Sequence, residues 1–172
     1  MDFLTLAKKR CSTRSFLKDE IKEEQLSIIL EAARVAPTNG NTQNFKIFVF
    51  DQASDIHHLS NFAQVYNAPL VMVVVYDKDK TFKTSVNTND SGLIDTSVII
   101  THMMLAAAEL DIGTVWINYF KAEPIRELLG LSNNMEVAQI LALGYPKVKF
   151  KDSNRHQKDR KQLHELVEFI RK

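Results

Sequence analysis

The sequence predicts a single domain of the α+β class, in which helices and strands share one hydrophobic core. Four short apolar runs are typical of strands, and several other segments repeat apolar residues at the spacing of an amphipathic helix. The chain has 172 residues, of which 45% are hydrophobic, so it is long enough to bury one core. It contains no internal repeat and no low-complexity linker, and we therefore expect residues 1–172 to form one domain.

Composition and charge exclude several classes of protein. The formal net charge of +1 gives no field that would favour nucleic acid as a partner. The first ten residues place apolar side chains before charged ones, the reverse of a secretory signal. The apolar run 68–76 is far shorter than the roughly twenty residues of a membrane span. We expect a soluble, cytoplasmic protein with no membrane partner and, since only one cysteine is present, no internal disulfide and no cysteine-based zinc site.

Two helices are expected in the first 35 residues. Residues 2–9 have the pattern of a short helix. We expect three of its apolar residues to pack inward: Phe3, Leu4 and Leu6. A second helix should begin at Glu23, because acidic residues favour the first turn, and end near Val35, shortly before a proline.

The stretch between these helices, Arg10 to Arg14, concentrates groups that bind anions. Two guanidinium groups with a hydroxyl between them provide forked donors that fit the tetrahedral oxygens of a phosphate. In an extended segment Arg10, Ser12 and Arg14 would share one side, and the two residues between them would point the other way. Short basic clusters are more often solvated faces, so taken alone this stretch is a weak phosphate signal.

Residues 37–43, Pro-Thr-Asn-Gly-Asn-Thr-Gln, are the second informative stretch. Such short polar residues turn tightly and offer amide and hydroxyl groups to a ligand, although an isolated loop of this kind is more often a plain connection. Asn44 to Phe50 then has the pattern of a strand. Phe45 and Ile47 would lie on one face of it and Phe48 on the other.

The next part of the chain contains a buried strand and a long helix. Residues 71–75 form an apolar run suited to a strand that is buried on both faces, and the polar residues 77–93 should form a loop or a loosely ordered lid. A helix over 94–110 is apolar around most of its circumference and belongs in a core or a subunit interface. Gly113 lies just past its end, where a left-handed residue is often needed.

The remaining elements are two strands and two helical segments. Strands are expected over 114–118 and 136–143, and between them a short helix over 125–129 should end at Gly130. Residues 163–170 have helical spacing and should pack on the body of the protein or on a partner chain.

Several motifs, in the same order along the chain, resemble the nitroreductase family of flavoproteins. They are Arg10-x-Ser12-x-Arg14, the loop Ala-Pro-Thr-x-x-Asn-x-Gln over 36–43 that leads into a strand, the Gly-x-x-Trp-Ile strand over 113–117, and Gly-Tyr-Pro over 144–146 followed by a basic tail. The resemblance extends from Arg10 to about Arg155. Two positions depart from the family pattern: the sequence reads Gln-Asn-Phe over 43–45 in place of Gln-Pro-Trp, and Thr38 in place of serine.

The resemblance implies an α+β, three-layer fold with a central, mostly antiparallel sheet flanked by helices. It also implies FMN at the interface of a homodimer, with NAD(P)H as hydride donor and a nitroaromatic, a quinone or a similar small molecule as acceptor, in a ping-pong cycle. Because the flavin carries the chemistry, no catalytic side chain and no metal are expected.

The same resemblance implies which residues bind FMN. Four side chains would hold the phosphate: Arg10, Ser12, Arg14 and Arg155. A loop of the other subunit would meet the edge of the isoalloxazine ring with Pro37, Thr38, Asn39, Asn41 and Gln43. Backbone groups of three residues would cover the opposite face: Trp116, Ile117 and Asn118.

Other functions stay open at this point. The chain could be a flavin-binding or flavin-consuming protein without nicotinamide-dependent turnover, or a dimeric interaction module that has lost the cofactor. A dehalogenase or flavin-fragmenting enzyme of the same superfamily is a third possibility, and the fold does not separate these.

Several single residues have a plain structural interpretation. His57 and His58 lack a third residue at the spacing of a zinc ligand, so we expect them on the surface. We expect His102 to be a core or interface histidine whose polar atoms are satisfied. Cys11, although placed between arginines, is interpreted as a passive thiol. Trp116 could stack near the flavin or fill the interface, and the sequence favours neither.

Overall fold

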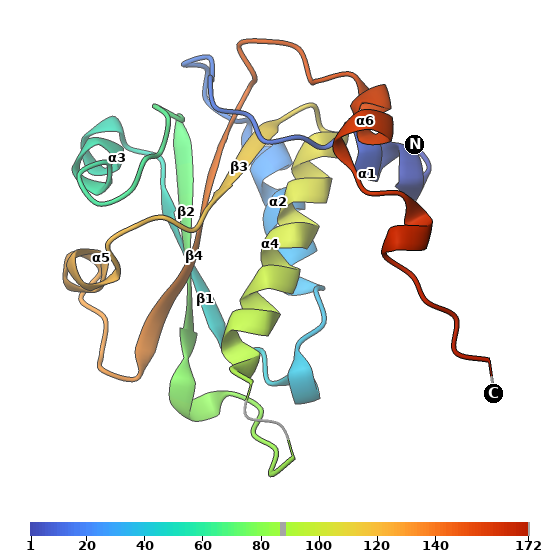
Figure 1. Ribbon diagram of the computed structural model, residues 1–172. Coiled ribbons are helices and arrows are strands. Elements are labelled where there is room, and N and C mark those ends of the chain that lie inside the picture. Colours follow the sequence, from blue (N-terminus) through green and yellow to red (C-terminus); the bar gives the residue numbers. More distant parts are fainter. Residues whose placement is uncertain (87–88, 172) are drawn as a thin grey trace.

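A four-stranded sheet forms the centre of the computed structural model, which describes residues 1–86 and 89–171 (Figure 1). The strands lie in the order β1 (Phe45–Phe50), β2 (Leu70–Asp77), β4 (Met135–Gly144) and β3 (Gly113–Ile117). All three pairings between them are antiparallel, which confirms the expected sheet. This order places β2 and β4 in the middle and leaves β3 at an edge.

Helices cover both faces of the sheet, so the protein has three layers (Figure 1). The helices are α1 (Phe3–Lys9), α2 (Glu23–Arg34), α3 (Ala53–Leu59), α4 (Ser91–Glu109), α5 (Ala122–Leu128) and α6 (His156–Asp159). Short 3-10 helices cover Asn39–Asn41, Lys78–Lys80, Ser153–Arg155 and Leu163–Glu165. α2 and α4 pack on one face of the sheet and α3 and α5 on the other. α3 is a helix that the sequence analysis did not anticipate.

The central strand β2 separates two hydrophobic cores. Met72 and Val74 face α2 and α4, whereas Val71 and Val73 face α3 and α5, and all four are fully buried. The strand expected over 71–75, buried on both faces, is thus confirmed, and it extends by a few residues in each direction. A continuous apolar run is required here because both faces of the strand lie in a core.

α4 is the central helix of the fold. Ten of its residues are buried against the sheet and α2. By length and composition alone it is one helix that could cross a membrane, and 56% of the relevant window is buried inside the protein, as in the core helix of a soluble domain.

The helix α4 begins earlier than expected. The side chain of Asp90 accepts hydrogen bonds from the backbone N–H groups of Gly92 and Leu93, and so caps a helix that starts at Ser91. The expected loop over 77–93 is therefore too long at both ends, since Asp77 ends β2 and α4 begins at Ser91, and residues 78–80 form a 3-10 turn within it. Residues 87–88 of that segment lie outside the described residues.

The turn after α4 also differs from the expectation. Asp111, with φ 60°, takes the left-handed conformation, and Gly113 instead begins β3. Gly113 is glycine for another reason: a Cβ at this position would lie 2.6 Å from Oγ1 of Thr13. Glycine is needed here because the N-terminal segment comes so close to the sheet, and not because the backbone has a positive φ.

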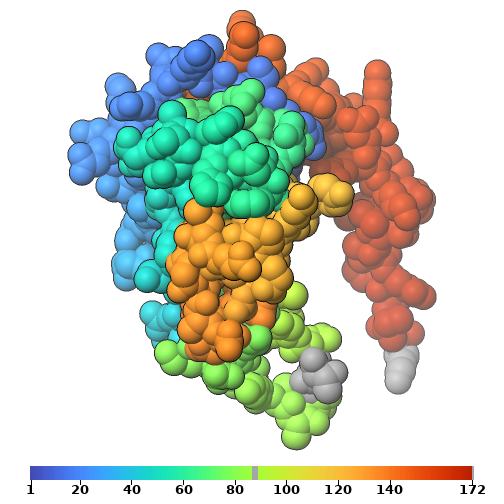
Figure 2. All heavy atoms as spheres, turned by 90° about the vertical axis from the view of Figure 1, so that its left-hand side faces the viewer, coloured from blue at the N-terminus to red at the C-terminus, as the bar shows by residue number. Residues whose placement is uncertain are grey.

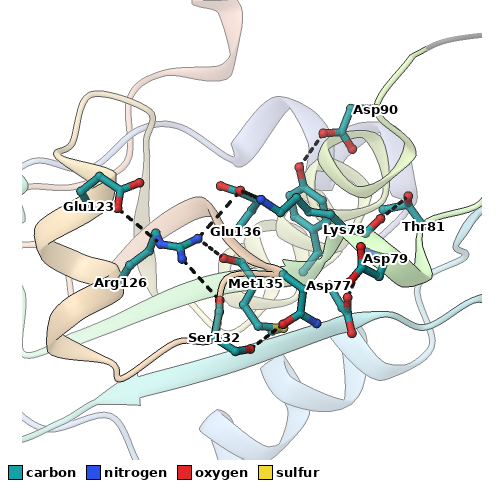
Figure 3. A network of polar contacts seen from close by, with 12 residues as sticks. Asp77, Lys78, Asp79, Thr81, Asp90, Glu123, Arg126, Ser132, Met135 and Glu136 are labelled. Atoms are coloured by element: carbon teal, nitrogen blue, oxygen red, sulfur yellow. Dashed lines mark hydrogen bonds and ion pairs between the residues drawn. The ribbon is translucent and has the colours of Figure 1, made fainter.

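A network of polar contacts joins α5 to the starts of β4 and the 78–80 turn (Figure 3). The guanidinium of Arg126 donates a 2.6 Å hydrogen bond to the carbonyl of Met135 and lies 3.5 Å from Glu123 and 3.8 Å from Glu136. Glu136 also pairs with Lys78 at 2.6 Å. The network fixes the end of the sheet that lies far from the N-terminal arginines (Figure 1).

Both ends of the chain expose apolar residues, contrary to two expectations. Phe3 and Leu4 of α1 are 71% and 61% exposed, so they do not pack inward. The C-terminal segment is not the expected helix: it has one 3-10 turn, Leu163–Glu165, and does not pack on the body. Figure 2 shows this segment standing away from the rest of the molecule. Local spacing predicts a helix only where a neighbouring surface stabilises it.

Candidate functional site

The Arg10 to Arg14 segment runs extended beside the edge strand β3. Ser12 forms an isolated parallel bridge with Thr114, and the N–H of Thr13 donates a 2.8 Å hydrogen bond to the carbonyl of Thr114. Cys11 and Thr13 are buried, whereas Ser12 and Arg14 are exposed. The alternation expected from the sequence is therefore confirmed.

The exposed side of this segment forms one wall of a basic pocket. The pocket has a volume of about 210 Å³ and is lined by Arg10, Cys11, Ser12, Arg14, Lys151, Arg155, Asp159 and Arg160. Five of these side chains are cations, and a single carboxylate opposes them. Such a concentration of forked donors is suited to a small, multiply charged anion.

Arg155 joins the two walls of the basic pocket. Its guanidinium donates hydrogen bonds to the carbonyls of Arg10, at 2.9 Å, of Lys151, at 3.1 Å, and of Asp152, at 2.9 Å. The ring Nε2 of His156 also lies 3.1 Å from the carbonyl of Lys8. The C-terminal tail is thus attached to the N-terminal segment at the point where the charges converge.

The pocket carries uncompensated positive charge. The pKa of Arg10 is lowered, chiefly because burial disfavours its charged form, and the nearby charges of Arg155 and Arg160 lower the pKa further. Mutual repulsion among clustered cations is relieved by a bound anion. Arg160 is a residue that the sequence analysis missed, since it lies in a basic tail whose register the pattern alone does not define.

The polar loop 37–43 is held in a defined conformation at the other end of α4. The N–H and the side-chain amide of Asn39 both donate to Oδ1 of Asp95, at 2.9 and 2.7 Å. Gly40 has φ 58°, and a Cβ there would lie 2.6 Å from the ring of Phe82. Asn41 and Gln43 also have positive φ, and the N–H of Gln43 donates to Oγ1 of Thr38. Pro37 precedes this turn and is exposed.

The segment Arg10 to Arg14, which lines the basic pocket, and the loop 37–43 therefore lie at opposite ends of one helix, as the ribbon shows for the two segments (Figure 1). Asp95 is near the start of α4, whereas Lys9, next to the pocket, pairs at 2.7 Å with Asp111, just beyond its end. At 1.5 Å per residue the 19 residues of α4 span about 28 Å, and its two ends are separated by nearly that distance. Within one chain the structure does not bring the two groups of predicted residues together.

The third predicted group lies on β3. Trp116 faces α4 and donates from Nε1 to the side-chain oxygen of Gln139, whose amide lies 3.4 Å from Oγ of Ser97. Ile117 is buried on the opposite face, and Asn118 is exposed. Among the described residues the outer edge of β3 pairs with other segments only at Thr114, so backbone groups of 116–118 are available on that edge.

One side of α4 is exposed and largely apolar. Leu93 and Ile94 are 43% and 45% exposed, and with Val98 they belong to an open groove of about 500 Å³ along the helix. His102 lies at the end of this groove, with Nδ1 2.9 Å from the carbonyl of Val98, so this polar atom is satisfied as expected. The two adjacent histidines of α3 are on the surface, as expected.

The chain thus forms a three-layer α+β domain with a basic pocket beside β3, and comparison with known proteins identifies its family. The model of the Nitroreductase family matches residues 7–64 and 52–145, and the chain belongs to this family. A protein of Archaeoglobus fulgidus, provisionally named NADH dehydrogenase/NAD(P)H nitroreductase, is 34% identical over 146 residues, which cover 80% of this chain and 82% of the relative. The NADPH-flavin oxidoreductase of Vibrio harveyi is 27% identical over 91% of this chain and 68% of its own length.

Two solved structures extend the comparison. A nitroreductase family protein of Clostridium difficile 630 superimposes with a TM-score of 0.94 at 39% identity, covering 98% of both chains. An FMN-dependent nitroreductase of Clostridium difficile R20291 has a TM-score of 0.81 at 27% identity, covering 98% of this chain and 99% of the other. These matches confirm the nitroreductase fold expected from the sequence motifs.

Proposed function

We propose that residues 1–172 form one FMN-binding domain of an oxidoreductase that takes a hydride from NAD(P)H and reduces a nitroaromatic, a quinone or a similar small acceptor. The observation that carries the proposal is the basic pocket, because its guanidiniums converge on a space of about 210 Å³ beside an exposed strand edge. A terminal phosphate has the negative charge that balances the cations of this pocket, and its tetrahedral oxygens accept hydrogen bonds from the guanidiniums. The FMN dependence named for the R20291 relative supports this choice of ligand.

The residues present fit FMN. Arg10, Ser12, Arg14 and Arg155 would hold the phosphate, together with Lys151 and Arg160. When bound, FMN supplies the two-electron chemistry by accepting a hydride and passing the electrons on. The residues of the protein would bind and orient the cofactor and exclude water from it. Such a site requires no acid and base pair.

We propose that the active form is a homodimer. The loop 37–43 and the basic pocket lie at opposite ends of α4, so two chains with antiparallel α4 helices would bring the loop of one protomer to the pocket of the other. The exposed apolar side of α4 supports such a two-fold interface, since an isologous contact uses the same patch twice. The apolar C-terminal tail would then cover the partner protomer instead of solvent.

In this arrangement NAD(P)H and the acceptor would use the same site in turn, which is the basis of a ping-pong cycle. Residues Trp116, Ile117 and Asn118 would offer backbone groups to the ring from the edge of β3. A protein of this kind would work in the cytoplasm, where nicotinamide nucleotides are supplied.

An absorbance spectrum of the purified protein from about 300 to 550 nm tests the proposal, followed by anaerobic addition of NADH and of NADPH. Yellow protein that either nucleotide bleaches, and that a nitroaromatic or a quinone then restores, is the expected result. Bound flavin that neither nucleotide reduces would favour a flavin-binding or flavin-consuming protein. Colourless protein that cannot be loaded with FMN would contradict the proposal.

A further inference from the structure

Asp95 is a buried carboxylate whose position is not explained by packing alone. It lies on α4, is 2% exposed, and its hydrogen bonds come from one residue, Asn39, to one carboxylate oxygen. Oδ1 accepts two hydrogen bonds from Asn39, while Oδ2 is buried and has no hydrogen-bond partner among residues 1–86 and 89–171. A buried oxygen without a partner is destabilising, so a carboxylate at such a position requires a reason.

The two hydrogen bonds determine how the side chain of Asn39 is turned. A side-chain amide has a donor end and an acceptor end, and Asp95 takes the donor, Nδ2, at 2.7 Å. The acceptor end, Oδ1 of Asn39, accepts no hydrogen bond from any residue that the structure describes, and Asn39 itself is exposed. The loop therefore presents the amide oxygen of Asn39 to whatever lies against it, while one N–H of Nδ2 is held by Asp95.

The backbone of the loop depends on the same carboxylate. The N–H of Asn39 donates to Oδ1 of Asp95 at 2.9 Å at the start of the turn that continues through Gly40 and Asn41, both with positive φ. Residues in this region are held only when their surroundings define them. Asp95 is a hydrogen-bond acceptor that reaches the turn from α4, 56 residues away.

We infer that Asp95 is a positioning residue that turns the Asn39 amide so that its oxygen accepts a hydrogen bond from an N–H or O–H group of the bound cofactor. The inference rests on the proposed function, because it assigns to the loop 37–43 a contact with FMN. Asp95 acts through Asn39 and does not itself touch the reacting atoms.

The test is to exchange the side chains of Asp95 and Asn39, first singly and then together. Asp95→Asn removes the charge that fixes the amide, and we expect FMN to bind roughly tenfold more weakly. Asn39→Asp places two carboxylates against each other, and we expect a larger loss. The double variant Asp95→Asn with Asn39→Asp restores a donor and acceptor pair in reverse, with a carboxylate oxygen still facing the ligand. Its affinity should be higher than that of Asn39→Asp, and the double-mutant cycle reports the coupling between the two side chains directly.

Two further measurements separate positioning from general damage. Inorganic phosphate binding, followed by thermal shift, should be unchanged in all three variants, because the basic pocket lies at the other end of α4. In the cofactor-free protein, hydrogen exchange of the backbone amide of Asn39 should be faster in Asp95→Asn than in the original protein. Glu31→Gln, a neutralised carboxylate on α2 that pairs with Arg34, serves as the charge-matched control.

The outcomes distinguish this inference from the proposed function. If the original protein binds no FMN, both the proposed function and this inference are contradicted. Original protein that binds FMN, with Asp95→Asn binding equally well or the double variant no better than Asn39→Asp, would overturn the positioning role alone.

Discussion

The guanidinium of Arg155 donates a 2.9 Å hydrogen bond to the backbone carbonyl of Arg10, across 145 residues of sequence. This contact joins the N-terminal segment to the C-terminal tail and closes the basic pocket between them. Because the tail otherwise buries no residue, the pocket and the attachment of the tail depend on each other.

The phosphate contact is tested by Arg14→Ala. We expect this variant to lose one charge-assisted hydrogen bond, about 1.5–3 kcal/mol, and to bind FMN about tenfold to a hundredfold more weakly. Quenching of flavin fluorescence measures the dissociation constant. Arg34→Ala removes an equal charge from the exposed surface of α2 and should leave the constant unchanged. If Arg14→Ala and the original protein have equal dissociation constants for FMN, Arg14 does not bind the phosphate.

The apolar C-terminal tail is tested by truncation after Lys161. The deleted segment contains four strongly exposed apolar side chains: Leu163, Leu166, Phe169 and Ile170. If they cover the partner protomer, the shortened chain should dissociate at higher protein concentration in analytical ultracentrifugation. Burying each such side chain contributes about 1.5–3 kcal/mol, so the shift should be easily measured. A shortened chain with the same association constant would show that the tail does not contribute to a dimer.

The close approach of the Arg10 to Arg14 segment to β3 is tested by Gly113→Ala. The added Cβ would meet the side chain of Thr13 at 2.6 to 2.8 Å, so the segment must shift. We expect a loss of about 1–3 kcal/mol in the free energy of unfolding together with weaker FMN binding. Gly130→Ala is the contrasting variant: Gly130 has φ 59° but open space around it, so it should lose about 1–2 kcal/mol from backbone strain and retain FMN affinity. Urea titration and flavin fluorescence measure the two quantities.

The acid stability of the sheet end in Figure 3 depends on Asp77. Its pKa is lowered, first by the hydrogen bond from the side chain of Asn134 and then by the N–H of Asp79 and by Lys80. A carboxyl group whose folded pKa lies below its unfolded pKa stabilises the fold above the unfolded value, and that contribution is lost as the pH falls through the folded value. We therefore expect Asp77→Asn to flatten the loss of thermal stability below about pH 4. A melting temperature with the same pH dependence in both proteins would contradict this role.

The strands and the main helices could be predicted because their signals are local. The all-apolar run of β2 and the alternation of Ser12 with Cys11 and Thr13 depend only on neighbouring residues and a period of two. The end of α5 at Gly130, with φ 59°, was also confirmed, since a left-handed stop is a property of one residue. The motifs of the candidate site were recognisable for the same reason.

What only the tertiary structure decided is which distant segments meet. It places Arg160 with Arg10, joins Asp95 to Asn39, turns Phe3 toward solvent and leaves the C-terminal tail away from the body. It also shows that Gly113 is needed for its close contact with Thr13 and not for a left-handed turn. The sequence by itself determined the elements and the residue types of the site. Their pairing required the fold, because long-range contacts depend on which faces and edges of the sheet are covered, and no local period encodes that choice.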